Sequence, residues 1–238
     1  MWNPWHGCTK ISEGCANCYM YQQDEQYNVN SSIITKVKTK FDMPIKKDRN
    51  NQYKIKSGTV VATCFTSDFF IEEADDWRQE VWQMVKARPD LTFYIITKRI
   101  HRFMDCIPDD WGSGYDNVII NTTAENQNRL DERVPIITKL PIKHRGIVIA
   151  PILESIDMRN HLESGAIQEV SVGGESGRNS RICDYDWIMS IRNNCIDNNV
   201  NFMFYQTGTR FKKGGKLYFI KKSMEKEQAL KANINFIK

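Results

Sequence analysis

Six short apolar runs recur along the chain, each bounded by polar or turn-forming residues and rich in β-branched and aromatic side chains. This is the pattern of buried β-strands. The runs are apolar at nearly every position, so both faces of the strands are expected to be covered, as in a parallel sheet packed between or against helices. The predicted strands are 59–65, 92–97, 117–121, 146–152, 169–172 and 201–205.

The segments between these strands carry apolar residues at helical spacing and predict helices at 71–88, 127–140, 158–163 and 185–198. Parallel neighbours need crossover connections, so the alternation predicts an α/β fold, a partial (β/α)6 barrel of the TIM type. A doubly wound open sheet is the alternative, since periodicity does not separate the two. Residues 32–57 alternate around Asp48-Arg49-Asn50-Asn51 and predict an inserted β-hairpin.

Length and composition favour one globular domain. The chain has 238 residues, of which 41% are hydrophobic and 26% charged, and these values exclude a mainly disordered or fibrous protein. We expect a single domain made of a cysteine-bearing loop (2–19), the hairpin (32–57), the barrel (58–208) and a C-terminal extension (209–238). No run of about 18 apolar residues occurs and the first residues do not resemble a secretory signal, which favours a cytoplasmic protein without a membrane span.

Positive charge is concentrated in two segments, although the net charge is only +4. Residues 36–56 contain eight Lys or Arg against two Asp, and residues 209–238 contain nine against two Glu. Basic segments of this kind attract phosphate groups, most simply those of a nucleic acid. A solvated lysine-rich surface is the competing interpretation, because aromatic residues are sparse among the charges.

Three of the seven cysteines lie within eleven residues, with the spacing Cys8-x6-Cys15-x2-Cys18. An odd number of cysteines with a local cluster indicates a metal site in a reducing compartment rather than a disulfide framework. Three soft thiolate ligands suit a 4Fe-4S cluster, which would leave one iron open to a substrate or cofactor. Zinc is the alternative, because His6 could complete a Cys3His set.

The other four cysteines are isolated among apolar neighbours and are interpreted as packing residues: Cys64, Cys106, Cys183 and Cys195. Trp2 and Trp5 flank the cysteine loop, and we expect them to pack around the metal centre and shield it from water.

The residues that follow the six strands are polar, although the strands themselves are apolar. In (β/α) folds the carboxyl ends of the strands meet at one edge, where the chemistry takes place. We therefore expect a polar mouth formed by Thr66-Ser67-Asp68, Lys98-Arg99, Thr122-Thr123-Ala124-Glu125-Asn126, Leu153-Glu154-Ser155, Gly173-Gly174-Glu175-Ser176-Gly177 and Gln206-Thr207-Gly208.

Several of these blocks, taken in order, resemble a known family. Together with Trp2-Asn3-Pro4-Trp5-x-Gly7-Cys8-x6-Cys15-x2-Cys18-Tyr19, the blocks Thr66-Ser67-Asp68-Phe69-Phe70, Thr97-Lys98-Arg99, Thr123-Ala124-Glu125-Asn126-Gln127, Pro151-Ile152-Leu153-Glu154 and Gly173-Gly174-Glu175-Ser176-Gly177 are similar to the phage Gp37/Gp68 (DUF5131) three-cysteine family, which is related to radical S-adenosylmethionine enzymes.

The resemblance implies a radical S-adenosylmethionine type of barrel with a 4Fe-4S cluster on Cys8, Cys15 and Cys18. S-adenosylmethionine would bind the open iron and give a 5′-deoxyadenosyl radical, with electrons from an external donor. Two features depart from that class. The first two cysteines are separated by six residues instead of three, and Gly173-Gly174-Glu175 follows the fifth predicted strand rather than the second.

The strand-end residues match the polar groups of S-adenosylmethionine. Thr66, Ser67 and Asp68 would meet its ammonium group, Lys98 or Arg99 its carboxylate, and Asn121, Thr123 or Glu125 its ribose. Glu154 and Glu175 would bind substrate or transfer protons, and Gly173 and Gly174 would let backbone approach the ligand. Some of these residues have structural alternatives: Ser67 and Asp68 could cap the following helix, and Lys98 and Arg99 could be solvated.

Two main hypotheses follow. The first is a radical S-adenosylmethionine enzyme acting on a nucleic acid or another phosphorylated substrate. The second is a zinc-stabilised, non-catalytic nucleic-acid-binding or interaction protein. A third possibility is an interaction subunit that supports a partner protein encoded beside it, since members of the resembled family often neighbour such a partner.

Overall fold

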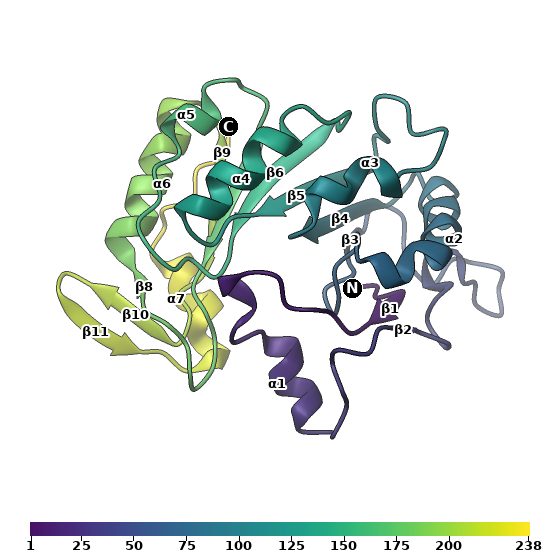
Figure 1. Ribbon diagram of the computed structural model, residues 1–238, viewed down its shortest axis with the longest axis horizontal. Coiled ribbons are helices and arrows are strands. Elements are labelled where there is room, and N and C mark those ends of the chain that lie inside the picture. Colours follow the sequence, from purple (N-terminus) through teal and green to yellow (C-terminus); the bar gives the residue numbers. More distant parts are fainter. The chain divides into compact units, whose positions relative to one another are not determined.

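The computed structural model describes residues 1–238 and contains one six-stranded sheet (Figure 1). Its strands are β3 (Val60–Thr63), β4 (Thr92–Thr97), β5 (Val118–Thr123), β6 (His144–Ile149), β7 (Glu169–Gly173) and β9 (Asn201–Gln206). They are hydrogen-bonded in the order β3-β4-β5-β6-β7-β9, and the pairs β3–β4, β6–β7 and β7–β9 are parallel. The order never reverses, so the sheet has no switch point. A doubly wound sheet is excluded, and the predicted half-barrel strand order is confirmed.

Helices occupy the connections in which they were expected. They are α2 (Asp75–Lys86), α4 (Gln127–Ile137), α5 (Arg159–Leu162) and α6 (Tyr185–Asp197), each lying inside its predicted range. Helix α4 begins at Asn126, whose side chain accepts a hydrogen bond from the Arg129 N–H, and α6 begins at Asp184 in the same way. None of the helices has the length and apolar character that crossing a membrane requires.

Among the elements that were not predicted are the helices α1 (Tyr19–Glu25), α3 (Phe103–Cys106) and α7 (Glu225–Lys231) and a hairpin of the C-terminal segment. All three of these helices are short and mixed in polarity, so their sequences carry too few periods to be recognised.

The chain forms two compact units, and the polypeptide passes between them several times. Unit 1 contains residues 1–9, 23–121 and 139–144, and unit 2 contains residues 10–22, 122–138 and 145–238. The two units draw on interleaved parts of the sequence. The prediction of one continuous domain stays a prediction.

Unit 1 has an aromatic core. Trp5, Phe69, Trp82 and Trp111 form a chain of ring contacts, with centroids 5.5, 4.9 and 5.1 Å apart, and each side chain is almost fully buried. Offset and edge-to-face pairs of this kind stabilise beyond the burial of their area. Trp5 and Trp2 are therefore packing residues of unit 1.

The predicted hairpin at 32–57 is shorter than expected. Its closed part is the antiparallel bridge Lys47↔Tyr53, and the Asp48 carboxylate accepts hydrogen bonds from the N–H groups of Asn50 and Gln52 inside the turn. The strand β2 (Thr35–Lys36) pairs instead with β1 (Trp5–His6). The Arg88 side chain is 1% exposed and donates hydrogen bonds to the backbone oxygens of Pro44 and Ile55, which hold this segment against the rest of unit 1.

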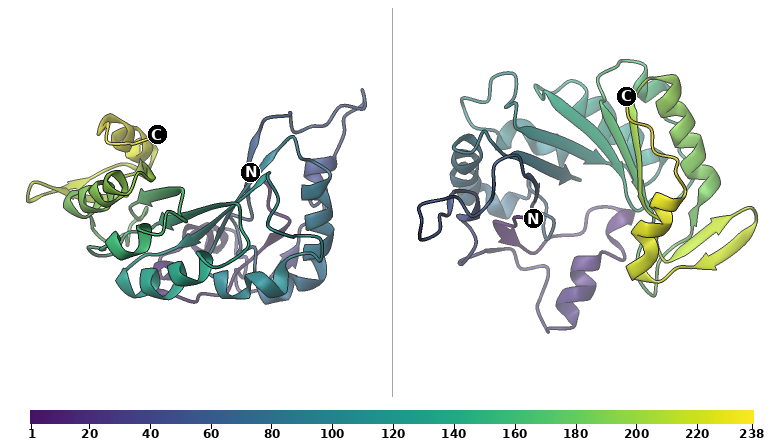
Figure 2. Two further views of the ribbon diagram at one scale, coloured as in Figure 1. Left: turned by 90° about the horizontal axis from the view of Figure 1, so that it is seen from above. Right: turned by 180° about the vertical axis from the view of Figure 1, so that it is seen from behind.

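The predicted C-terminal extension is an integral part of unit 2. Strand β10 (Arg210–Lys213) pairs with β11 (Lys216–Phe219) on one side and with β8 (Cys183–Asp184) on the other. Helix α7 follows and packs on β9 (Figure 2). Phe236 then forms a bridge with Phe202 of β9. The last thirty residues thus return to the edge of the main sheet.

Candidate functional site

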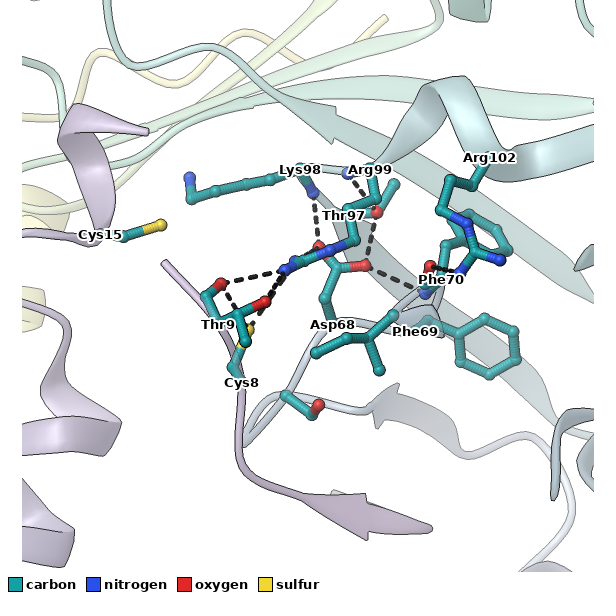
Figure 3. Close-up of polar contacts among 12 residues, drawn as sticks. Cys8, Thr9, Cys15, Asp68, Phe69, Phe70, Thr97, Lys98, Arg99 and Arg102 are labelled. Atoms are coloured by element: carbon teal, nitrogen blue, oxygen red, sulfur yellow. Dashed lines mark hydrogen bonds and ion pairs between the residues drawn. The ribbon is translucent and has the colours of Figure 1, made fainter. Parts of the chain in front are cut away.

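In unit 1 the cysteine loop lies against the ends of β3 and β4, and Asp68 is the centre of this contact (Figure 3). Its carboxylate accepts hydrogen bonds from the Thr97 hydroxyl (2.7 Å), the Lys98 N–H (2.8 Å) and the Phe70 N–H (3.0 Å). It also pairs with Arg99 at 3.3 Å. Asp68 is 5% exposed and Arg99 6%. The predicted strand-end residues therefore form one buried network.

Arg99 connects this network to the first cysteine. Its Nη2 donates to the backbone oxygen of Thr9 (2.9 Å) and to the Thr9 hydroxyl (2.6 Å), and its Nη1 lies 3.8 Å from the Cys8 Sγ (Figure 3). A guanidinium beside a thiol favours the thiolate, the form that binds metals. Arg99 is thus a buried clamp on Cys8 and Thr9 rather than a solvated side chain.

The chain before Cys8 is also tied to the end of β3. The Ser67 hydroxyl donates to the Gly7 backbone oxygen, and the Gly7 N–H donates to the Thr66 backbone oxygen (3.1 Å). The Asn3 Oδ1 accepts hydrogen bonds from the N–H groups of Phe65 (2.7 Å) and Thr66 (3.3 Å). Ser67 therefore positions the cysteine loop, and its hydroxyl does not cap the following helix.

In unit 2 the same loop continues onto the ends of β5 and β7. Glu125, which is fully buried, pairs with Arg133 (3.0 Å), accepts a hydrogen bond from the Gly14 N–H (3.2 Å) and accepts another from the Ser12 hydroxyl. The Ser12 Oγ also lies 3.8 Å from the Cys15 Sγ. Glu125 is thus an anchor of the loop that carries Cys15.

Glu175 holds the next part of that loop. Its carboxylate accepts hydrogen bonds from the Asn17 Nδ2 (3.0 Å) and from the Arg181 N–H (2.8 Å), and it pairs with the Arg181 guanidinium at 2.5 Å. Burial raises the pKa of Glu175, but the hydrogen bonds from Arg181 and Asn17 outweigh it and leave the pKa below its usual value. Glu175 is therefore an ionised anchor of Asn17, the residue that precedes Cys18.

Gly173 and Gly174 are required for packing. A Cβ at Gly173 would lie 2.6 Å from the Tyr205 ring, and one at Gly174 would collide with the Thr207 backbone oxygen. Glu154 lies in an exposed position, and its Oε1 accepts a hydrogen bond from the Gln127 N–H (2.8 Å) at the start of α4. The Thr123 hydroxyl accepts a hydrogen bond from the Arg133 Nη1 (3.0 Å).

Three polar atoms at strand ends are buried and have no hydrogen-bond partner. They are the Thr66 Oγ1 and Asn121 Oδ1 of unit 1 and the Thr122 Oγ1 of unit 2. Asn121 is fully buried, and its Nδ2 donates to the Ile95 backbone oxygen (3.3 Å). A buried polar atom without a partner costs free energy, so these positions are suited to accept a ligand's hydrogen bonds.

None of the seven cysteines forms a disulfide, and Cys15 is buried while Cys8 and Cys18 are half-buried. Cys8 belongs to unit 1, and Cys15 and Cys18 belong to unit 2. No group of three or more His, Cys, Asp or Glu side chains is arranged to hold a metal ion. The His6 Nε2 bonds the Asp24 carboxylate at 2.9 Å, so only its Nδ1 could serve as a ligand.

Sequence reasoning missed the partners that complete these networks. Thr9, Ser12 and Asn17 lie between the cysteines, and their polar side chains beside the expected metal ligands were a usable signal. Arg133 and Arg181 gave none, because an arginine in a helix or a loop is ordinarily a surface residue.

One solved structure similar to the chain is a cysteine-to-alanine mutant of spore photoproduct lyase with a dinucleoside spore photoproduct. It has 14% sequence identity and a TM-score of 0.48, and the match covers 97% of this chain and 71% of that one. No curated protein matches the chain. The family model described as "protein of unknown function (DUF5131)" matches residues 1–233, so the chain belongs to the DUF5131 family.

Proposed function

We propose that the protein is a radical S-adenosylmethionine enzyme in which Cys8, Cys15 and Cys18 hold a 4Fe-4S cluster. Its proposed substrate is a nucleic acid, because the basic segments 36–56 and 209–238 favour a phosphate-bearing ligand. With the cluster and S-adenosylmethionine bound, the two groups would supply reductive cleavage of the sulfonium and hydrogen-atom abstraction from the substrate.

One observation carries the proposal: in each unit, the cysteine-bearing loop is anchored by buried charged residues that follow strands of the main sheet. In unit 1 Arg99 bonds Thr9 and lies beside Cys8, and Asp68 pairs with Arg99. Glu125 and Glu175 hold residues 12–17 in unit 2. Burying four charged groups costs free energy. Such a cost is expected where the geometry of a loop has to be fixed, as it is for metal ligands.

The residues present fit a thiolate-bound cluster. Three cysteines outside disulfides are a soft donor set, and the Arg99 guanidinium beside Cys8 would offset part of the cluster's negative charge. Zinc, the alternative, would need His6 as a fourth ligand through its Nδ1, since its Nε2 bonds Asp24.

The proposed role of each strand-end residue depends on whether its polar atoms already make hydrogen bonds or ion pairs within the protein. Asp68, Arg99, Glu125 and Glu175 position the loop. Asn121 and Thr66 offer unpartnered oxygens, so we assign them to the polar groups of S-adenosylmethionine. Glu154 is exposed and its Oε1 accepts a hydrogen bond from the Gln127 N–H at the start of α4, so it is the carboxylate that we assign to substrate.

The test is the formation of 5′-deoxyadenosine from S-adenosylmethionine by the anaerobically reconstituted, reduced protein. The wild type should form it, and replacing any of Cys8, Cys15 or Cys18 by Ala should abolish formation. Cys195→Ala is the matched control, because Cys195 is buried within α6, away from the loop, and should leave the rate unchanged. Absence of 5′-deoxyadenosine from an iron-loaded wild type would contradict the proposal.

A further inference from the structure

The hairpin β10–β11 ends in a strongly cationic tip at a two-residue glycine turn. Gly214 and Gly215 have φ angles of +57° and +76°, as in the two-residue turn that fits the twist of a hairpin. The register places Lys213 directly opposite Lys216. Like charges directly opposite one another destabilise a hairpin unless an anion lies between them. No acidic residue occurs from Thr209 to Met224, so the hairpin supplies no such anion itself.

Aromatic rings stand beside these cations. The Lys213 Nζ lies 4.2 Å from the Tyr185 ring centre, the Lys216 Nζ lies 5.2 Å from the Tyr218 ring centre, and the Arg210 guanidinium lies 6.0 Å from the Phe219 ring centre. Neighbouring residues of a strand point to opposite faces, so Tyr218 and Phe219 give each face of the hairpin a ring next to a cation.

The two rings of β11 are exposed, Phe219 at 72% and Tyr218 at 41%. The hairpin does not need them for its own packing, because Phe211 fixes its base. Phe211 is buried, stacks on Phe204 with ring centres 6.1 Å apart, and is paired with Cys183 of β8. The Lys212–Asp184 pair (2.9 Å) adds a second attachment at the base.

Protection of an edge strand is the structural alternative, because lysines along an edge prevent other strands from pairing with it. It accounts for the charges but not for Phe219. An exposed phenylalanine on an edge strand promotes association instead of preventing it.

We propose that the β10–β11 hairpin is a docking surface for single-stranded nucleic acid that crosses the free edge of β11. Phe219 and Tyr218 would stack on bases on its two faces, with Arg210 contacting phosphates on the Phe219 face and Lys213 and Lys216 on the Tyr218 face. Flat exposed rings between cations match a strand whose bases are unpaired, whereas a duplex would present only phosphates to such rings. The inference deepens the proposed function in naming the substrate class and the surface that binds it. It concerns binding, so it stands apart from the radical chemistry.

The experiment measures binding of the full chain, prepared without a cluster, to a fluorescent oligothymidylate of about 15 nucleotides, within the span such sites cover. Fluorescence anisotropy is recorded over a series of salt concentrations. Phe219→Ala should weaken binding about 5- to 100-fold, the effect of losing one base stack. Leu230→Ala is its control, because Leu230 is 70% exposed outside the hairpin and should have no effect.

Charge is tested by the double variant Lys213→Glu with Lys216→Glu. It should reduce the slope of log affinity against log salt by about 1.4, the contribution of two phosphate contacts to a single strand. The control, Lys86→Glu with Lys139→Glu, makes the same change of charge at exposed positions outside both basic segments. Thermal unfolding checks each variant, and Phe219→Ala carries the test if the double variant does not fold.

Three results would overturn the proposal: no binding by the wild type, equal losses in the variants and their controls, or binding to anionic vesicles or polyglutamate that Phe219→Ala weakens as strongly. The proposed enzyme function can fail separately. If the cluster-free chain binds oligothymidylate as described but never forms 5′-deoxyadenosine, the docking surface stands without the radical chemistry. If the protein forms 5′-deoxyadenosine but does not bind oligothymidylate, the proposed enzyme function stands and the docking surface is refuted.

Discussion

At the scale of single residues, the positions of the charged groups were predictable but their partners were not. Asp68, Arg99, Glu125 and Glu175 follow apolar strands, and that pattern placed them at the sheet edge. The sequence suggested that they face a ligand. In the structure Arg99, Glu125 and Glu175 bond the cysteine loop, and Asp68 pairs with Arg99. Contacts between residues far apart in the sequence leave no local pattern to read.

Arg99 should control the mobility of the first cysteine. Lysine cannot reproduce the two hydrogen bonds that the guanidinium makes to Thr9. In the cluster-free protein, Arg99→Lys should speed amide hydrogen exchange at Gly7 and Cys8 by about 10-fold or more, since one charge-assisted bond contributes about 1.5–3 kcal/mol. Arg102→Lys, which alters a pair with Asp75, is the control and should leave these amides unchanged. Unchanged exchange in Arg99→Lys would refute the clamp.

Glu175 should make the stability of unit 2 depend on pH. Its pKa is lowered in the folded chain, so its ionised form stabilises the fold above its ordinary pKa, and this contribution is lost as pH falls through the folded value. Glu175→Gln should cost about 1–3 kcal/mol in urea unfolding at pH 7, and the difference should shrink as the pH is lowered to about 3. A difference independent of pH would contradict the ionised anchor.

At the scale of elements, strands with several apolar residues were predictable and short amphipathic pieces were not. Strand β4 has its predicted bounds, and the other five main strands differ only at their ends. Strands β10 and β11 were missed because their lysines and glycines resemble a loop, and β2 pairs with β1 from a distant part of the chain. Pairing with a strand far away in sequence depends on the fold already being formed.

The turn before Cys8 offers a test at this scale. Gly7 has a φ of +96°, and a Cβ there would collide with the Ile33 backbone oxygen, whereas Gly58 has a φ of +78° and open space around it. Both Ala variants pay the cost of a positive φ, about 1–2 kcal/mol. Gly7→Ala should therefore lower the melting temperature clearly more than Gly58→Ala. Equal losses would show that the loop is not closely packed on its neighbours.

At the scale of the whole molecule, the strand order was predictable from the sequence. The alternation of six apolar runs with helical segments predicted the half-barrel order. The metal-binding loop, predicted from the spacing of three cysteines, stays a prediction. The division into two units was not foreseen, because their residues are interleaved along the chain. The pairing of Phe236 with β9 was not foreseen either, because the lysine-rich composition of the C-terminal segment is typical of an exposed tail. Hydrophobic pattern reports local burial, and it does not report which distant segments share a core.

The central claim is that three thiolates share one iron-sulfur cluster, and the most direct test quantifies iron, sulfide and zinc in one anaerobic preparation. We predict about four iron and four sulfide per chain, lost in the Ala variant of each of Cys8, Cys15 and Cys18. The reduced protein should give an electron paramagnetic resonance signal that changes when S-adenosylmethionine is added. Stoichiometric zinc without sulfide, retained only while His6 is intact, would contradict the account.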